Sequence, residues 1–229
     1  MMARRRLLGV MGGGMVAVLG GCGILGTEKS YRFRMTVEVE TPQGLKTGSG
    51  VYEISARKLT PLTSEEAEGS AGARGEATVV DLAGGPLFLL LKNDDAGQPL
   101  HARVTAALAP DARIRNVEDY VATVGKLGGW FGGAKAELPR ADWPMMVRFR
   151  SIDDPKSVEK VDPGAIGVKR IVVETTGDEV TTGIEKRLGW LSRQRGSLIR
   201  RLSVPDPSNP PLGARINEMS FSTELRRGQ

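Results

Sequence analysis

Cys22 is the residue whose type and surroundings point most directly to chemistry. It is the only cysteine of the chain, and it follows Leu19, Gly20 and Gly21. A signal peptidase needs narrow side chains just before the bond that it cuts. A thiol just after that bond can be alkylated by a diacylglycerol group. The spacing therefore predicts cleavage after Gly21 and attachment of a lipid to Cys22.

The residues before Leu19 have the composition of an export signal. Three cations, Arg4, Arg5 and Arg6, precede an uncharged, largely apolar stretch from 7 to 19. Together with this leader, the Leu19–Cys22 segment resembles the lipobox of bacterial lipoproteins. The resemblance implies a signal peptide at 1–21, a flexible tether at 22–29 and a single domain at 30–229. It also implies a protein anchored in the bacterial cell envelope and facing the periplasm, and Gly23 in place of an acid favours the outer membrane over the inner.

Two alternatives concern the leader. The uncharged run from 7 to 26 has 20 residues, which is the length of a membrane-spanning helix. Eight of them are glycine, and each glycine costs about 1 kcal/mol of helix stability relative to alanine, so a cleaved leader is favoured over an uncleaved anchor. The segment 3–8 also resembles the twin-arginine export motif. Ordinary secretory signals carry arginine runs too, so both export routes stay open.

The charge of the chain does not favour a nucleic-acid partner. The 32 basic and 27 acidic residues give a net charge of +5. Three of these charges lie in the leader, which has no acid, so the mature chain has a net charge of +2. No nucleic acid is expected as a partner.

Little else in the sequence points to catalysis. His101 is the only histidine, which argues against a Ser-His-Asp triad and against a multi-histidine metal site. The paired acids Asp94-Asp95 and Asp153-Asp154 lie in segments typical of turns. We therefore predict no catalytic residue, metal or cofactor. A hydrolase of envelope polysaccharide or peptidoglycan that works with two carboxylates needs only Asp and Glu, and it stays the alternative.

A cationic segment near the C-terminus is the candidate binding surface. Between 186 and 201 there are six cations and no acid, and Trp190 and Leu191 lie among them. Such a patch could contact anionic envelope polymers or lipid headgroups, and the other interpretation is a solvated helix end and loop. A second envelope protein is a further partner to consider, because loop aromatics at Trp130-Phe131 and Trp143 could bind it unless they fold onto the core. The six cations are Lys186, Arg187, Arg193, Arg195, Arg200 and Arg201.

The N-terminal part of the domain has the pattern of a β-hairpin. Apolar and polar residues alternate from 31 to 40, which predicts a strand with one buried face. The segment 41–44 has turn chemistry, and 51–56 is the returning strand. Gly48 and Gly50, which lie in the hairpin just before this returning strand, predict a bulge or a close approach of another backbone.

The remaining pattern predicts an α+β fold in which a mostly antiparallel sheet carries two or three short helices on one face. Asn116 is expected to cap a helix over 117–127, and Thr182 to start a capping box for a short helix with Ile184, Leu188 and Leu191 on one face. The segment 100–108 is helical in composition but alternates in spacing. The other expected segments are a surface loop at 64–75, strands at 77–82, 86–91, 145–149, 169–174 and 216–225, and an extended crossing at 205–211. The second of these strands is apolar on both faces and should be central in the sheet.

Three segments of the mature chain, 31–44, 153–158 and 180–188, resemble a family of small proteobacterial proteins. That family has no assigned activity, so the resemblance implies a folded domain and adds no function. The sequence thus predicts a membrane-anchored envelope lipoprotein with a non-catalytic binding or structural role. The carboxylate-based hydrolase is the alternative.

Overall fold

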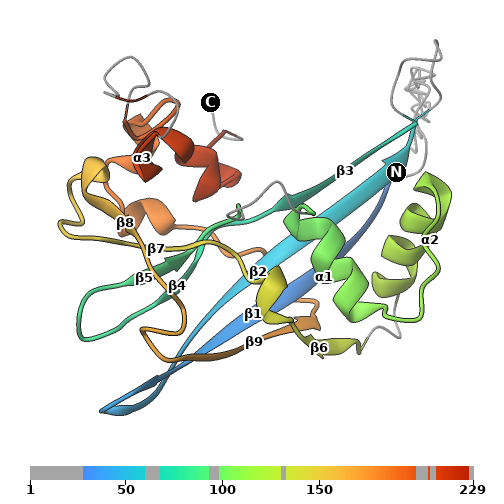
Figure 1. The fold of residues 1–229 in the computed structure, drawn as a ribbon. Coiled ribbons are helices and arrows are strands. Elements are labelled where there is room, and N and C mark those ends of the chain that lie inside the picture. The colour runs from blue at the N-terminus through green and yellow to red at the C-terminus, as the bar shows by residue number, and fades with distance from the viewer. Residues whose placement is uncertain are drawn as a thin grey trace, which may run out of the picture.

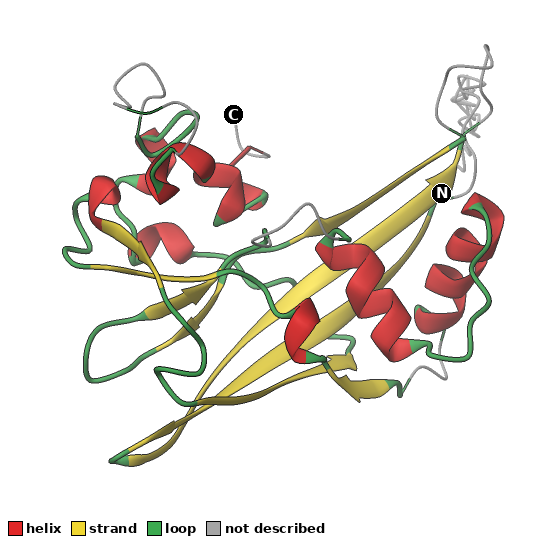
Figure 2. Cartoon of the chain, in the orientation of Figure 1, coloured by secondary structure: helices red, strands yellow, loops and turns green. Residues whose placement is uncertain are grey.

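The structure is a computed structural model, and it describes residues 28–59, 68–92, 98–129, 133–199, 206 and 210–226. These residues form a mixed α+β fold that is mostly antiparallel sheet with short helices (Figures 1 and 2). The strands are β1 (Lys29–Thr41), β2 (Gly44–Lys58), β3 (Gly69–Arg74), β4 (Thr78–Val80), β5 (Leu87–Leu89), β6 (Lys135–Glu137), β7 (Met146–Phe149), β8 (Val158–Lys160) and β9 (Val168–Thr175). The α-helices are α1 (Leu100–Leu108), α2 (Val117–Leu127) and α3 (Leu212–Arg215). The 3-10 helices are η1 (Arg140–Asp142), η2 (Pro155–Ser157), η3 (Ile184–Lys186), η4 (Leu191–Arg193), η6 (Glu218–Ser220) and η7 (Glu224–Arg226).

A long hairpin of β1 and β2 is the centre of the larger sheet. Its alternating residues are buried on one face, as the period of two predicts; they are Tyr31, Phe33, Met35, Val37 and Val39. Pro42 and Gln43 form the turn between Thr41 and Gly44, and Gly44 has a φ of 100°, which only glycine adopts readily. The predicted hairpin is confirmed.

Two antiparallel sheets share the described part of the chain. The five-stranded sheet has the order β3-β2-β1-β9-β6, and the four-stranded sheet has the order β4-β5-β7-β8. Helices α1 and α2 cover one face of the five-stranded sheet, with α2 packed on β1 and β2 (Figure 1). The predicted helices on one sheet face are thus confirmed, although the strands divide between two sheets instead of one.

The two sheets meet where β4 crosses the hairpin at Gly48 and Gly50. A Cβ atom on Gly48 would lie 2.1 Å from the carbonyl oxygen of Val79, and one on Gly50 would lie 2.7 Å from the Thr78 hydroxyl. Gly48 therefore lets the second backbone approach, and Gly50 leaves room for the Thr78 side chain. This is the close approach that the two glycines predict.

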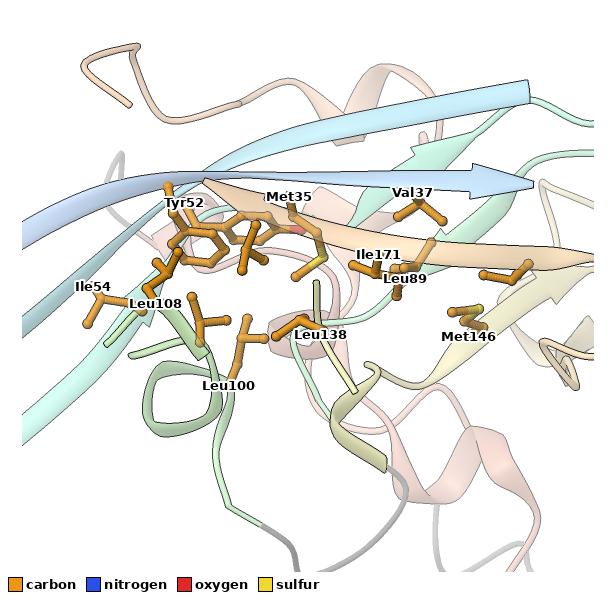
Figure 3. Packing of buried hydrophobic residues seen from close by; sticks show 14 of the residues in the cluster. Met35, Val37, Tyr52, Ile54, Leu89, Leu100, Leu108, Leu138, Met146 and Ile171 are labelled. Atoms are coloured by element: carbon orange, nitrogen blue, oxygen red, sulfur yellow. The ribbon is translucent and has the colours of Figure 1, made fainter. Parts of the chain in front are cut away.

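The four-stranded sheet has a hydrophobic core on each of its faces. Leu87 and Leu89 of β5 belong to a core shared with the hairpin and α1, whereas Phe88 and Leu90 belong to a second core. Figure 3 shows Leu89 beside Ile171 in the first core. The prediction that 86–91 is a central strand is confirmed, because β5 lies between β4 and β7 and is buried on both faces.

Helix α2 follows from local sequence, whereas packing decides α1. The side chain of Asn116 accepts a hydrogen bond from the backbone N–H of Asp119, so the predicted cap of α2 is confirmed. The ambiguous segment 100–108 is a helix, because Leu100, Val104 and Leu108 lie on one face and enter the first core.

Three predictions of local structure are wrong. Residues 69–74 of the expected loop form strand β3, because their small side chains fit an edge beside β2. Gly183 begins η3 with a positive φ and no side-chain cap, so the capping box at Thr182 is absent, although Ile184, Leu188 and Leu191 are all buried. Residues 216–225 form no strand, because Asn217 and Ser220 bond to each other's backbone and turn the chain into η6.

Candidate functional site

The predicted lipid-attachment residue, Cys22, lies outside the described residues, as do Arg200 and Arg201 of the cationic segment. The rest of that segment is only partly available to a ligand. Arg187 donates two hydrogen bonds to Asp81, at 2.6 and 2.9 Å, and this contact lowers the pKa of the Asp81 carboxyl. Arg195 donates to the backbone carbonyl oxygens of Ser192 and Gln194.

Within the described part of this segment, Lys186 and Arg193 are exposed and form no ion pair. Trp190 and Leu191, which the sequence places among the cations, are buried in the second core. The Trp190 indole N–H donates to the carbonyl oxygen of Ile152 at 2.9 Å. The two apolar residues within the cationic segment, Trp190 and Leu191, therefore add no exposed apolar surface to its charge.

The other residues considered for chemistry have structural contacts. Trp143 is half-buried, and its indole N–H donates to the carbonyl oxygen of Leu138 at 2.9 Å, so this loop aromatic folds onto the core. His101 is half-buried on α1 with its ring edge against Tyr120, and burial lowers its pKa. Asp154 accepts a hydrogen bond from the backbone N–H of Lys156, as expected of a turn residue. Trp130, Phe131, Asp94 and Asp95 lie outside the described residues.

A buried carboxylate was not predicted from the sequence. Glu76 is 3% exposed and accepts hydrogen bonds from the backbone N–H of Ile184 (2.8 Å) and the hydroxyl of Ser222 (3.0 Å). Burial raises its pKa. Its hydrogen bonds connect the residues just before β4 to Ile184 and Ser222, which come much later in the chain. Glu76 is therefore a structural residue.

The hollows that the described residues line contain no pair of carboxylates for hydrolysis. Four hollows of about 480, 220, 400 and 680 Å³ are lined by described residues. Each is lined by at most one acid, Glu53 in the first and Asp111 in the last, and Glu53 is paired with Arg32 and Arg74. Among the described residues there is also no group of three His, Cys, Asp or Glu side chains that could hold a metal ion.

The end of the domain where β1 begins is the surface nearest to Cys22 in the chain. We call it the Lys29 end, and its residues are Lys29, Arg57, Lys58, Gly69, Ile114 and Arg115, together with Arg113, which precedes Ile114 in the chain. Lys29 pairs with Ala56, and Lys58 pairs with Gly69, so three strands have their ends here (Figure 1). The 400 Å³ hollow lies at this end, because Ala56, Gly69 and Ile114 all line it.

Comparisons of this chain with protein-family models, with curated proteins and with solved structures gave no match. None of the helices among the described residues is long and apolar enough to cross a membrane.

Proposed function

We propose that this protein is a lipoprotein held in the bacterial cell envelope by a lipid on Cys22, with a non-catalytic binding or structural role. The observation that carries the proposal is the position of β1 relative to the Leu19–Cys22 segment. The strand begins at Lys29, seven residues after Cys22, and its first buried side chain is Tyr31. Cleavage after Gly21 and acylation of Cys22 would therefore leave the whole strand intact.

The interior supports a role that does not depend on catalysis. Glu76 is held by a backbone amide and a hydroxyl, and the buried Arg103 donates to the backbone carbonyl of Asp142. Buried polar groups held in this way stabilise a fold. A binding role would then be performed at the surface, with an anionic envelope polymer or another envelope protein as partner. Gly23, which replaces an acid after the cysteine, favours the outer membrane.

Labelling with radioactive palmitate tests the lipid anchor. The full chain should incorporate label in bacterial cells and enter the detergent-rich phase after phase separation. Because Cys22 is the only cysteine, Cys22→Ala should abolish the label and move the protein to the aqueous phase. Label that persists in Cys22→Ala, or wild-type protein without label, would contradict the proposal.

A further inference from the structure

The length of the link to Cys22 limits which part of the domain can approach the membrane. Seven residue steps separate Cys22 from Lys29, and an extended chain spans at most about 3.5 Å per residue, which gives roughly 25 Å. The β1 strand runs a further twelve steps from Lys29 to Thr41, or about 40 Å. A lipid on Cys22 thus keeps the Lys29 end within roughly 25 Å of the bilayer, whereas the hairpin turn lies about 40 Å further along β1.

The Lys29 end carries an exposed apolar side chain. The described part of the chain has three large hydrophobic residues that are clearly exposed, namely Leu45, Ile114 and Met219. Only Ile114, which is 38% exposed, lies at the Lys29 end, whereas Leu45 lies beside the hairpin turn. Val117 and Val121 line the same hollow as Ile114 and continue its apolar surface along α2.

Cations surround Ile114. Arg113 and Arg115 flank it in the chain, and Arg57 lines the same hollow. The acids Glu118 and Asp119 are paired with Lys58 and Arg115, although the Arg115 side chain remains 80% exposed. Among the described residues, Lys29, Arg57 and Arg113 have no ion-pair partner.

We propose that the Lys29 end lies against the anionic phospholipid surface of the membrane that holds the Cys22 lipid, with Ile114 at the depth of the headgroups. This inference rests on the proposed lipid anchor. Arg57 and Arg113 contact phosphate oxygens, because cations near an anionic lipid surface are attracted to it. Glu28 and Glu68 are also exposed at this end, so the attraction from charge alone is weak. The lipid anchor and the apolar Ile114 supply the rest of the attraction between the Lys29 end and the membrane.

The cationic segment 186–195 fits this contact less well. Trp190 and Leu191 are buried beneath it, and Arg187 is bound to Asp81. A membrane surface binds best to cations that accompany exposed apolar side chains. Lys186 and Arg193 are therefore the natural comparison for the cations of the Lys29 end.

Spin labels test the contact directly. Because Cys22 is the only cysteine and is acylated under the proposal, a cysteine introduced by Ile114→Cys or Leu45→Cys is labelled alone. Both full-length, lipidated variants are placed in vesicles of phosphatidylglycerol and phosphatidylcholine. We expect the label at 114 to lose access to a water-soluble nickel chelate and gain access to oxygen, whereas the label at 45 stays open to the chelate. Equal access at both positions would overturn the inference and leave the lipid anchor intact.

Charge variants identify the cations that hold this orientation. Arg57→Glu with Arg113→Glu, in the Ile114→Cys background, should restore chelate access at 114. The matched pair Lys186→Glu with Arg193→Glu should leave it protected. If only the second pair restores access, the cationic segment faces the membrane and our inference is wrong. If the wild-type protein takes up no lipid, the proposed function fails and the inference fails with it.

Discussion

Glu76 is the residue with the least expected environment. Its carboxylate is buried at the junction of the two sheets, where it accepts hydrogen bonds from Ile184 and Ser222, which lie 108 and 146 positions away in sequence. The phenol of Tyr52 and the hydroxyl of Thr78 form a second buried hydrogen bond next to it, at 2.7 Å, and burial raises the pKa of Tyr52 to about 12. These groups fix the first residues of the second sheet against the hairpin.

The raised pKa of Glu76 gives a prediction about pH. In the native state the carboxyl holds its proton to a higher pH than in the unfolded chain, so the native state binds more protons between the two pKa values. The contribution of Glu76 to the free energy of unfolding is therefore full below the unfolded pKa and declines as the pH rises through the native pKa. Glu76→Gln keeps a hydrogen-bonding side chain that does not titrate. Urea unfolding at a series of pH values from about 4 upward should show that the variant gains stability relative to wild type as the pH rises.

A difference between variant and wild type that stays constant with pH would contradict this prediction. Glu76→Ala serves as the control for the hydrogen bonds. It leaves the Ile184 amide without its partner and should cost about 1–3 kcal/mol.

Residues differ in how strongly the sequence alone points to them, and Cys22 stays a prediction because it lies outside the described residues. Cys22 stands out because its signal is contiguous, with narrow residues before it and an apolar run before those. Glu76 gives no such signal, because its partners are distant in the chain. Ile114 was missed as well, since an isolated apolar residue between two arginines gains meaning only when the fold places it at the Lys29 end.

At the scale of elements, the crossing of β4 over the hairpin depends on Gly48. A methyl group there would contact the Val79 carbonyl at 2.1 Å, so Gly48→Ala must push the sheets apart. We expect a loss of about 1–3 kcal/mol of unfolding free energy, as for other overpacked sites. Gly72→Ala is the matched control, because a Cβ on Gly72 in strand β3 meets nothing within 4 Å and should change stability by less than about 0.5 kcal/mol. Equal effects in thermal unfolding would show that Gly48 does not act through this contact.

Elements with strong local signals were predicted, and those fixed by distant contacts were not. The hairpin follows from period two and turn chemistry, and α2 from its cap and apolar stripe. The three-residue strands β6 and β8 were not predicted, because they are too short to show a period and are defined by pairing with β9 and β7. The segment 216–225 alternates like a strand, but the short-range hydrogen bonds of Asn217 and Ser220 outcompete a ladder there.

For the whole molecule, the four-stranded sheet couples the two cores. Because neighbouring residues of β5 enter different cores, loss of one core removes support from the other. Phe221 is fully buried in the second core, with ring centroids 6.2 Å from Phe88 and 5.9 Å from Trp190. Phe221→Ala should therefore cost about 3–5 kcal/mol and should weaken the first core as well as the second.

Hydrogen exchange followed by mass spectrometry checks this coupling. In Phe221→Ala, peptides from β1 and from residues 184–193 should lose protection in parallel. If protection fell only in residues 184–193, the cores would unfold independently. Leu45→Ala, at an exposed position beside the hairpin turn, is the control and should change neither peptide.

The crossing at Gly48 and Gly50 also says how distant relatives could be recognised. Position 48 tolerates almost nothing but glycine, and position 50 faces the Thr78 hydroxyl at a separation too short for a side chain. Gly48 and Gly50 are two residues apart and so lie on the same face of β2. Their Gly-x-Gly spacing therefore marks the place where β4 crosses the hairpin. A distant relative whose surface residues no longer resemble those of this chain would still need the two glycines at the same position in its long hairpin. Without them, its second sheet could not pack against the hairpin in the same way.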